Sequence, residues 1–440
     1  MDDLRQKLSR ILNGAVGREE HKQTPEWKVP DVAPREPSIR DRLHRLGLKS
    51  ASGLAAGVGL IGQRHRLEEV LVGEIVTTPF GECLEIKSTY KSQFRHGPYC
   101  LEDFFQIDLR DLDRICGGTG FDKIDPEEVL FVDLETTGLS LGAGTWVFLA
   151  GFGFFRSGQY HVRQLFLRDF AEEAAFLFQA GRRMEGFRYV VTFNGKRFDI
   201  PLLEGRYALH RNAHGLPALV QWDLLYPARR LWRGRLEDCK LETIEQERLL
   251  LNREDNDIRG ERIPEIYLRY IHTGEAGCLH RVVYHNAMDI LTLASLAVHV
   301  QRSSQEKDPR QVNLLSLGRY YERIGIHEEG RRCYEIVSSR GPTREERELG
   351  SLQLAMRRKR EGRIEDAIAG WEALIREGSP HRTACCEELA KHYEHRTKEL
   401  VKAIRMVEIA LEGIDPLNGR LRTQLDQRLK RLLKKRGKKS

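Results

Sequence analysis

Hydrophobic positions follow two different periods along this chain of 440 residues. Between residues 126 and 305, short apolar runs such as 129–134 and 189–193 alternate with segments of helical spacing such as 282–300. From about Asn313 onward, nearly the whole pattern is helical. Strands that alternate with helices predict an α/β domain with a mixed sheet flanked by helices, and the C-terminal part is predicted to be all-α.

The pattern divides the chain into five segments. The predicted boundaries are 1–40 for a polar segment and linker, 41–125 for a poorly defined region with a β-hairpin, 126–305 for the α/β domain, 310–427 for the helical part and 428–440 for a basic tail. A loose repeat runs through the helical part, since Gly325 and Gly362 are 37 residues apart and Pro380 and Pro416 are 36 apart. This period is similar to that of tetratricopeptide repeats, about 34 residues. The alternative is an ordinary helical bundle.

Composition narrows the class of protein. The chain is 40% hydrophobic and 31% charged, and no apolar run is long enough to cross a bilayer. It has no signal-peptide pattern, and its eight cysteines form no CxxC pair, so we expect reduced thiols and a cytoplasmic location. The net charge of +7 is concentrated in residues 428–440, which hold eight Lys or Arg and no acid. Such a tail can contact nucleic acid phosphates, or it can simply aid solubility.

Two carboxylates end the first strand of the α/β domain. Side chains alternate between the faces of a strand, so Asp133 and Glu135 point the same way. Two like charges on one buried face repel each other and are costly to desolvate. A divalent cation would offset that cost, and carboxylate oxygens suit Mg²⁺ or Mn²⁺.

Two further acids lie in separate segments. Asp199 follows the strand at 189–193, and Asp289 lies in the helix predicted at 282–300. Each pattern alone is commonly a turn, a helix cap or a surface pair, but their order and contexts together predict one site. Four carboxylates could hold two cations about 4 Å apart, an arrangement that suits in-line displacement at phosphorus.

A histidine accompanies the last acid. His285 precedes Asp289 by four residues, so the two share a helix face, and an imidazole there could act as a general base. Tyr284 is rotated away by about 100° on the same helix. Asp223 and Asp238 are further acidic candidates that nothing in the sequence places in the site.

The three segments resemble the three exonuclease motifs of the DEDD superfamily over about residues 128–300. Asp133 and Glu135 match the first motif, Asn194 and Asp199 the second, and Asp289 the third. The resemblance implies a ribonuclease H-like fold, cleavage of nucleotides from 3′ ends, and two divalent metal ions, Mg²⁺ or Mn²⁺. It looks closest to the bacterial YprB-like group, in which tetratricopeptide-like helices follow the nuclease domain.

The resemblance also implies a nucleic acid substrate, DNA or RNA. Asn194 would orient the strand, and Lys196 and Arg197 could hold a phosphate, although solvated loop charges are an equal alternative. The helical repeats would bind a protein partner or extend the nucleic acid surface, and no membrane association is expected.

The third motif departs from both branches of the superfamily. One branch has Tyr, three residues and Asp, and the other has His, four residues and Asp, whereas this chain has His285 at the shorter spacing and Tyr284 at the longer. We therefore predict a metal-dependent 3′–5′ exonuclease with His285 as the base. The rivals are a catalytically weak or inactive nuclease-like adaptor, and an endonuclease or nucleotide hydrolase.

Overall fold

The computed structural model describes residues 65–120, 123–138, 142, 144–210, 215–253, 257–414 and 419–437. The predicted segment 1–40 and the start of the segment 41–125 lie outside these residues. The chain forms two compact units. The first, here the sheet unit, combines residues up to Leu225 with Ile244–Gln301, and the second, here the helical unit, combines Tyr226–Thr243 with residues from Arg302 onward.

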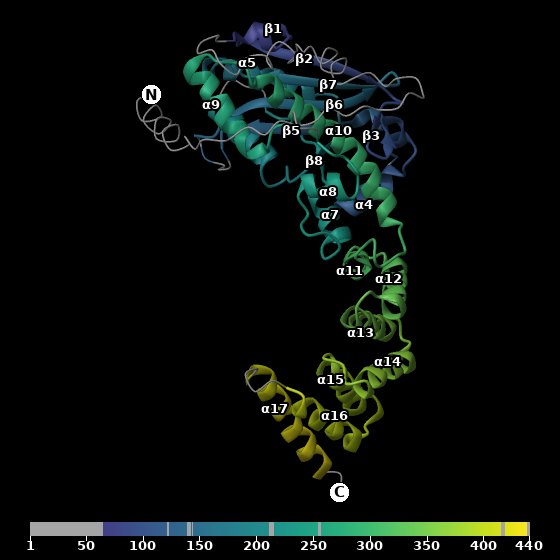
Figure 1. Ribbon diagram of the computed structural model, residues 1–440. Helices are drawn as coiled ribbons and strands as arrows, with labels where there is room; N and C mark the ends of the chain where they lie inside the picture. Colours follow the sequence, from purple (N-terminus) through teal and green to yellow (C-terminus); the bar gives the residue numbers. More distant parts are fainter. Residues whose placement is uncertain are drawn as a thin grey trace, which may run out of the picture. The chain divides into compact units, whose positions relative to one another are not determined.

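The sheet unit is built on a seven-stranded mixed sheet of order β1-β2-β7-β6-β5-β8-β9 (Figure 1). The strands are β1 Glu74–Thr78, β2 Gly81–Lys91, β5 Val129–Thr136, β6 Val147–Arg156, β7 Gln159–Phe166, β8 Tyr189–Thr192 and β9 Val220–Asp223. Pairing is antiparallel from β1 to β5 and parallel from β5 through β8 to β9. A separate two-stranded ribbon joins β3 Arg95–His96 to β4 Tyr99–Cys100.

Strand β5 is the strand at which the pairing changes from antiparallel to parallel. Its residues 129–132 are all fully buried, as expected for an apolar run covered on both faces. Because β5 and β8 are parallel, their carboxyl ends meet at the same edge of the sheet. Polar side chains that follow these two strands therefore come together.

Helices cover the sheet. They are α3 Leu67–Val70, α4 Leu109–Cys116, α5 Glu173–Met184, α6 Asp199–Leu209, α8 Leu241–Glu247, α9 Ile263–Thr273 and α10 Leu279–Ser304, with short 3₁₀ turns at Leu101–Phe105, Pro126–Glu128, Phe170–Glu172 and Gly260–Arg262. Helix α10 packs on the face that carries Gly153 of β6 and Gln164 of β7, where the Gln164 side chain donates a hydrogen bond to the carbonyl of Val283. In the part of the chain that is described, no helix is long and apolar enough to span a bilayer.

In the helical unit, each helix from α11 to α17 packs on the next one along the chain. They are α11 Leu314–Arg323, α12 His327–Arg340, α13 Arg344–Arg360, α14 Ile364–Arg376, α15 Arg382–His392, the π-helical turn Tyr393–Thr397, α16 Leu400–Glu412 and α17 Gly419–Gly437. Nearly all of α7 Leu225–Trp232 belongs to the same unit. Left-handed residues fall between the helices of three successive pairs, at Gly325, Gly362 and Lys398. The predicted fold class, an α/β ribonuclease H-like domain followed by an all-α region, is confirmed.

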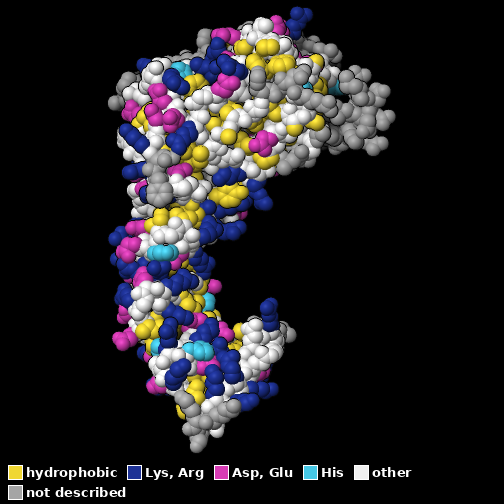
Figure 2. All heavy atoms as spheres, turned by 180° about the vertical axis from the view of Figure 1, so that it is seen from behind, with side chains coloured by type: hydrophobic (Ala, Val, Ile, Leu, Met, Phe, Trp, Pro, Cys, Tyr) yellow, Lys and Arg dark blue, Asp and Glu magenta, His cyan; other side chains and the backbone are white. Residues whose placement is uncertain are grey.

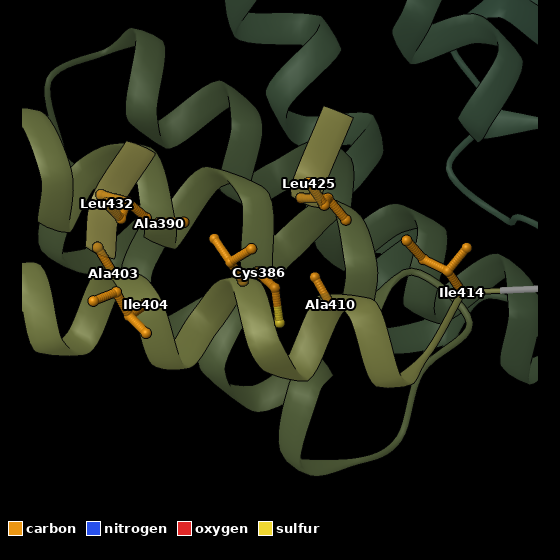
Figure 3. Packing of buried hydrophobic residues seen from close by; sticks show 9 residues of the cluster. Cys386, Ala390, Ala403, Ile404, Ala410, Ile414, Leu425 and Leu432 are labelled. Atoms are coloured by element: carbon orange, nitrogen blue, oxygen red, sulfur yellow. The ribbon is translucent and has the colours of Figure 1, made fainter. Parts of the chain in front are cut away.

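Most of the predicted basic tail, residues 428–440, is helical. Residues 428–437 are the last turns of α17, because Leu425 and Leu432 are buried against α15 and α16 (Figure 3). The buried carboxylate of Glu394 accepts hydrogen bonds from three of the basic side chains of α17, those of Arg428, Arg431 and Lys435. Packing and ion pairing thus hold residues 428–437 in place, whereas the sequence showed only that they are rich in Lys and Arg.

Candidate metal centre

The four predicted acids come from three elements of the sheet unit. Asp133 and Glu135 lie on β5, Asp199 is the first residue of α6, which follows β8, and Asp289 lies on α10. Asp199 and Asp289 are buried, whereas Asp133 and Glu135 are half-buried. The parallel pairing of β5 with β8 brings the first three acids to one edge of the sheet.

The electrostatics show that these carboxylates converge. Burial, followed by the charges of Asp289, Glu135 and Asp199, raises the pKa of Asp133 well above its usual value. Burial, then Asp289 and Asp199, likewise raises the pKa of Glu135. Burial and Asp223 raise the pKa of Asp199 to about 7. Such carboxylates are short of positive charge, and a divalent cation would supply it.

A compact set of donor atoms lies inside this group. One ligand atom each from Glu135, His285 and Asp289 lie within 4.8 Å of one another. The carboxylate oxygens suit Mg²⁺ or Mn²⁺, whereas an imidazole nitrogen is a ligand of transition metals. Glu135 and Asp289 of the four predicted acids, together with His285, could therefore hold a divalent cation, whereas Asp133 and Asp199 do not join this compact set.

Asn286 fixes the first carboxylate of the site. Its Nδ2 donates to Asp133 Oδ2 at 2.8 Å and to the Asp133 carbonyl at 3.1 Å, and its Oδ1 accepts from Gln164 Nε2 at 2.8 Å. Gly151, which pairs with Asp133 across β5 and β6, makes room for this amide. A Cβ at position 151 would lie 2.3 Å from Asn286 Oδ1.

His285 faces the acids of the site. His285 Nε2 lies 3.5 Å from Asp289 Oδ2, and Nδ1 lies 3.0 Å from Asp257 Oδ1. Burial acts to lower the pKa of His285, but Asp289 and Asp257 raise it above its ordinary value. Tyr284 lines a small cavity of about 110 Å³ together with Arg253 and Asp257, both of which also contact His285. A carboxylate that holds one imidazole nitrogen while the other faces the site is the arrangement of an oriented general base.

Arg253 brings positive charge into the group. Its guanidinium contacts Asp289, forms two hydrogen bonds to Glu245 at 2.6 and 2.8 Å, and lies 3.0 Å from Asp257. Burial acts to lower the pKa of Arg253, but Asp289 and Glu245 raise it above the usual value. Arg253 Nη1 also lies 2.8 Å from His285 Nδ1, so that nitrogen can either accept from Arg253 or donate to Asp257.

The predicted substrate-binding residues lie on the loop between β8 and α6. Asn194, Lys196 and Arg197 are all exposed, and Asn194 has a left-handed φ of 68°. Asp223 at the end of β9 holds this loop, accepting from Asn194 N at 2.7 Å and from Lys196 N at 3.1 Å. Asp223 therefore supports the loop that leads to Asp199.

The last acidic candidate, Asp238, has a separate structural role. It precedes α8 and accepts hydrogen bonds from Lys240 N at 3.0 Å and from Thr243 Oγ1 at 2.6 Å.

Comparison with known proteins agrees with this geometry. Residues 130–301, which span all four acids, match the model of the RNase H superfamily. The chain is 30% identical over 362 residues to the uncharacterized protein YprB of Bacillus subtilis, across 80% of this chain and 86% of that protein. The chain belongs to the YprB family.

The match of residues 130–301 to the RNase H superfamily indicates a nuclease-type function. This class comprises hydrolases that cleave phosphodiester bonds, bind nucleic acid and usually use divalent metals. The YprB protein of Bacillus subtilis is itself uncharacterized.

Four side chains around the candidate centre have no role in the sequence prediction: Arg253, Glu245, Asp257 and Asn286. Three of them come from α8 and the irregular stretch after it, where no periodic pattern marks a position. Asn286 was visible beside His285, but its partners Asp133 and Gln164 are more than 120 residues away in the chain. A sequence signal existed only for Asn286, through its place between His285 and Asp289.

Proposed function

We propose that this chain is a metal-dependent 3′–5′ exonuclease acting on DNA or RNA. Two divalent cations, Mg²⁺ or Mn²⁺, would be held by Asp133, Glu135, Asp199 and Asp289. The observation that carries this proposal is the cluster of Glu135, His285 and Asp289, whose ligand atoms lie within 4.8 Å of one another. Burial and nearby acids also raise the pKa of Asp133 and Glu135. Natural proteins keep such a cluster where a cation or a reaction uses it.

The residues around the metal site have different roles in the proposed hydrolysis. When bound, the cations would activate the attacking water and stabilise the leaving oxygen. His285 accepts the proton of that water, and Asp257 orients the imidazole through Nδ1. Asn286 keeps the Asp133 carboxylate in place. On the exposed loop before Asp199, Asn194 orients the strand, while Lys196 and Arg197 hold its phosphates.

A digestion assay tests this function. Single- and double-stranded DNA and RNA, labelled at the 5′ end, are incubated with the protein and Mn²⁺. We expect a ladder that shortens one nucleotide at a time from the 3′ end. Asp133→Ala should abolish it, whereas the matched control Asp366→Ala, which removes an exposed carboxylate of α14, should not. Wild-type turnover by Asp133→Ala would overturn the metal site, and internal fragments would indicate an endonuclease.

One observation favours a second candidate, a nuclease-like protein that binds nucleic acid without cleaving it. The Arg253 guanidinium contacts Asp289 and therefore occupies part of the space that a metal cation would need. Calorimetric Mn²⁺ titration separates the candidates. Binding of Mn²⁺ by a protein that cleaves none of the substrates would support the adaptor, and tighter binding by Arg253→Gln would identify the guanidinium as the competitor.

The helical unit is proposed to consist of tetratricopeptide-like pairs. The support is the spacing of Gly325, Gly362 and Lys398, whose left-handed backbones recur every 36 or 37 residues between paired helices. Such arrays expose a groove that can bind a protein partner. The eight free cysteines suit a reducing compartment such as the cytoplasm.

A further inference from the structure

A basic pocket of about 580 Å³ lies within the helical unit. Four arginines line it: Arg319 and Arg323 of α11, and Arg357 and Arg360 of α13. The members of each pair are four or three residues apart, so each pair lies on one face of its helix. Figure 2 shows that Lys and Arg side chains are frequent on the surface of this unit, with acidic side chains among them.

The two pairs of arginines differ in how they are neutralised. Glu322, the one acid lining the pocket, lies 3.2 Å from Arg357 and 3.4 Å from Arg360. Arg319 and Arg323 have no carboxylate within 4.0 Å among the described residues, and Arg323 instead lies over the ring of Tyr320. The pocket therefore presents two exposed guanidiniums whose charge is not balanced by a neighbouring acid.

We propose that this pocket binds phosphates of a single nucleic acid strand through Arg319 and Arg323. The inference rests on the proposed function, which makes a polyanion the substrate. A guanidinium presents a planar fork of donors that matches phosphate oxygens. A volume of about 580 Å³ lies within the range of about 300–1,000 Å³ that holds organic ligands. His327 at the rim adds a ring on which a base can stack.

A binding titration tests the pocket separately from catalysis. The full chain is titrated in EDTA, which prevents metal-dependent cleavage, against a fluorescent single-stranded 20-mer at several salt concentrations. The double variant R319A/R323A is compared with R376A/R405A, which removes two exposed arginines of α14 and α16 outside the pocket. We expect the first to weaken binding and to reduce the salt slope by about 0.7 per lost contact, and the second to change neither.

Three outcomes would overturn the proposal, and two of them concern specificity. Equal weakening by both double variants would mean diffuse attraction, and displacement of the 20-mer by polyglutamate of equal charge would point to an acidic protein partner. The result is independent of the metal centre. If R319A/R323A binds the 20-mer as the wild type does, and the wild type cleaves nucleic acid, the pocket proposal is wrong and the proposed function stands. If R319A/R323A loses binding in EDTA, the pocket proposal is supported even for a protein that never cleaves.

Discussion

The side-chain amide of Asn286 on α10 donates to the carboxylate of Asp133 on β5, with 2.8 Å between Nδ2 and Oδ2. The same amide accepts a hydrogen bond from Gln164 of β7. A buried chain of polar groups thus runs from β7 through α10 to β5. The orientation of the first predicted metal ligand depends on the helix that carries the last one.

Asn286→Ala should damage the site more than the fold. It removes the donor to Asp133, and partners that orient metal ligands typically contribute about 10–100-fold to metal affinity or activity. It also leaves Gln164 short of a partner, at a cost of about 1–3 kcal/mol. Calorimetric Mn²⁺ titration and urea unfolding measure the two effects. The control is Ser295→Ala, which removes from the same helix a buried hydroxyl that donates a hydrogen bond to the His96 carbonyl. Equal Mn²⁺ affinity in both variants would contradict the assigned role.

Gly151→Ala should destabilise the sheet unit. Its Cβ would lie 2.3 Å from Asn286 Oδ1, so either the amide or the strand must move. Overpacking of this kind costs about 1–3 kcal/mol. The control is Gly205→Ala within α6, where a Cβ meets nothing within 4 Å and helix propensity favours alanine. Urea denaturation should show opposite signs for the two substitutions. A stable Gly151→Ala protein with unchanged Mn²⁺ affinity would argue against close packing at Asn286.

His285→Ala should lower turnover far more than Tyr284→Phe. His285 Nε2 faces Asp289, and a general base contributes about 10²–10⁴-fold. Tyr284 is rotated from His285 by about 100° on the same helix, and its replacement by Phe keeps the ring and loses only the hydroxyl. Single-turnover rates at saturating Mn²⁺ compare the two. A larger loss in Tyr284→Phe would reverse the assignment of the base.

The stability of the helical unit should depend on pH through Glu394. Burial acts to raise the pKa of this carboxyl, but Lys435 and Arg431 of α17 lower it from 4.5 to about 2. A depressed acid stabilises the fold above its unfolded pKa, and that contribution is lost as pH falls from about 4.5 to about 2. Glu394→Gln should cost about 1–3 kcal/mol at pH 7, and its stability deficit relative to wild type should shrink over that acidic range. Thermal unfolding at several pH values would show it, and a deficit that stays constant would contradict the ion-pair role.

Lys398→Gly should stabilise the helical unit. Lys398 has a left-handed φ of 61°, at the place where Gly325 and Gly362 stand in the two preceding pairs. A left-handed backbone costs a residue with a Cβ roughly 1–2 kcal/mol. The net gain from glycine is smaller than this, because glycine has more conformational freedom to lose from the unfolded chain. Lys402→Gly in α16 is the matched control and should destabilise by about 1 kcal/mol. Equal effects of the two in urea unfolding would argue against a shared repeat geometry.

The sequence by itself determined the fold class and the segments that carry the acids. The apolar run 129–134 predicts a strand, and the periodicity of 282–300 predicts a helix, because the two spacings are local properties of the backbone. Once a strand is specified, the same-side placement of Asp133 and Glu135 follows from its geometry. The resemblance to exonuclease motifs added the expectation that Asp199 and Asp289 join them.

Only the tertiary structure decided how these acids are held. Arg253 and Asp257 enter the site from an irregular segment, and Gly151 makes room for Asn286 from a neighbouring strand. The basic C-terminal run is part of a packed helix because Leu432 is buried and the Glu394 carboxylate pairs with basic side chains of the run. Each of these outcomes depends on burial and on charges far apart in the chain. Such long-range interactions do not appear as a periodic pattern in the sequence. Local spacing predicts which face of a helix or strand a side chain occupies, but not which residues it contacts there.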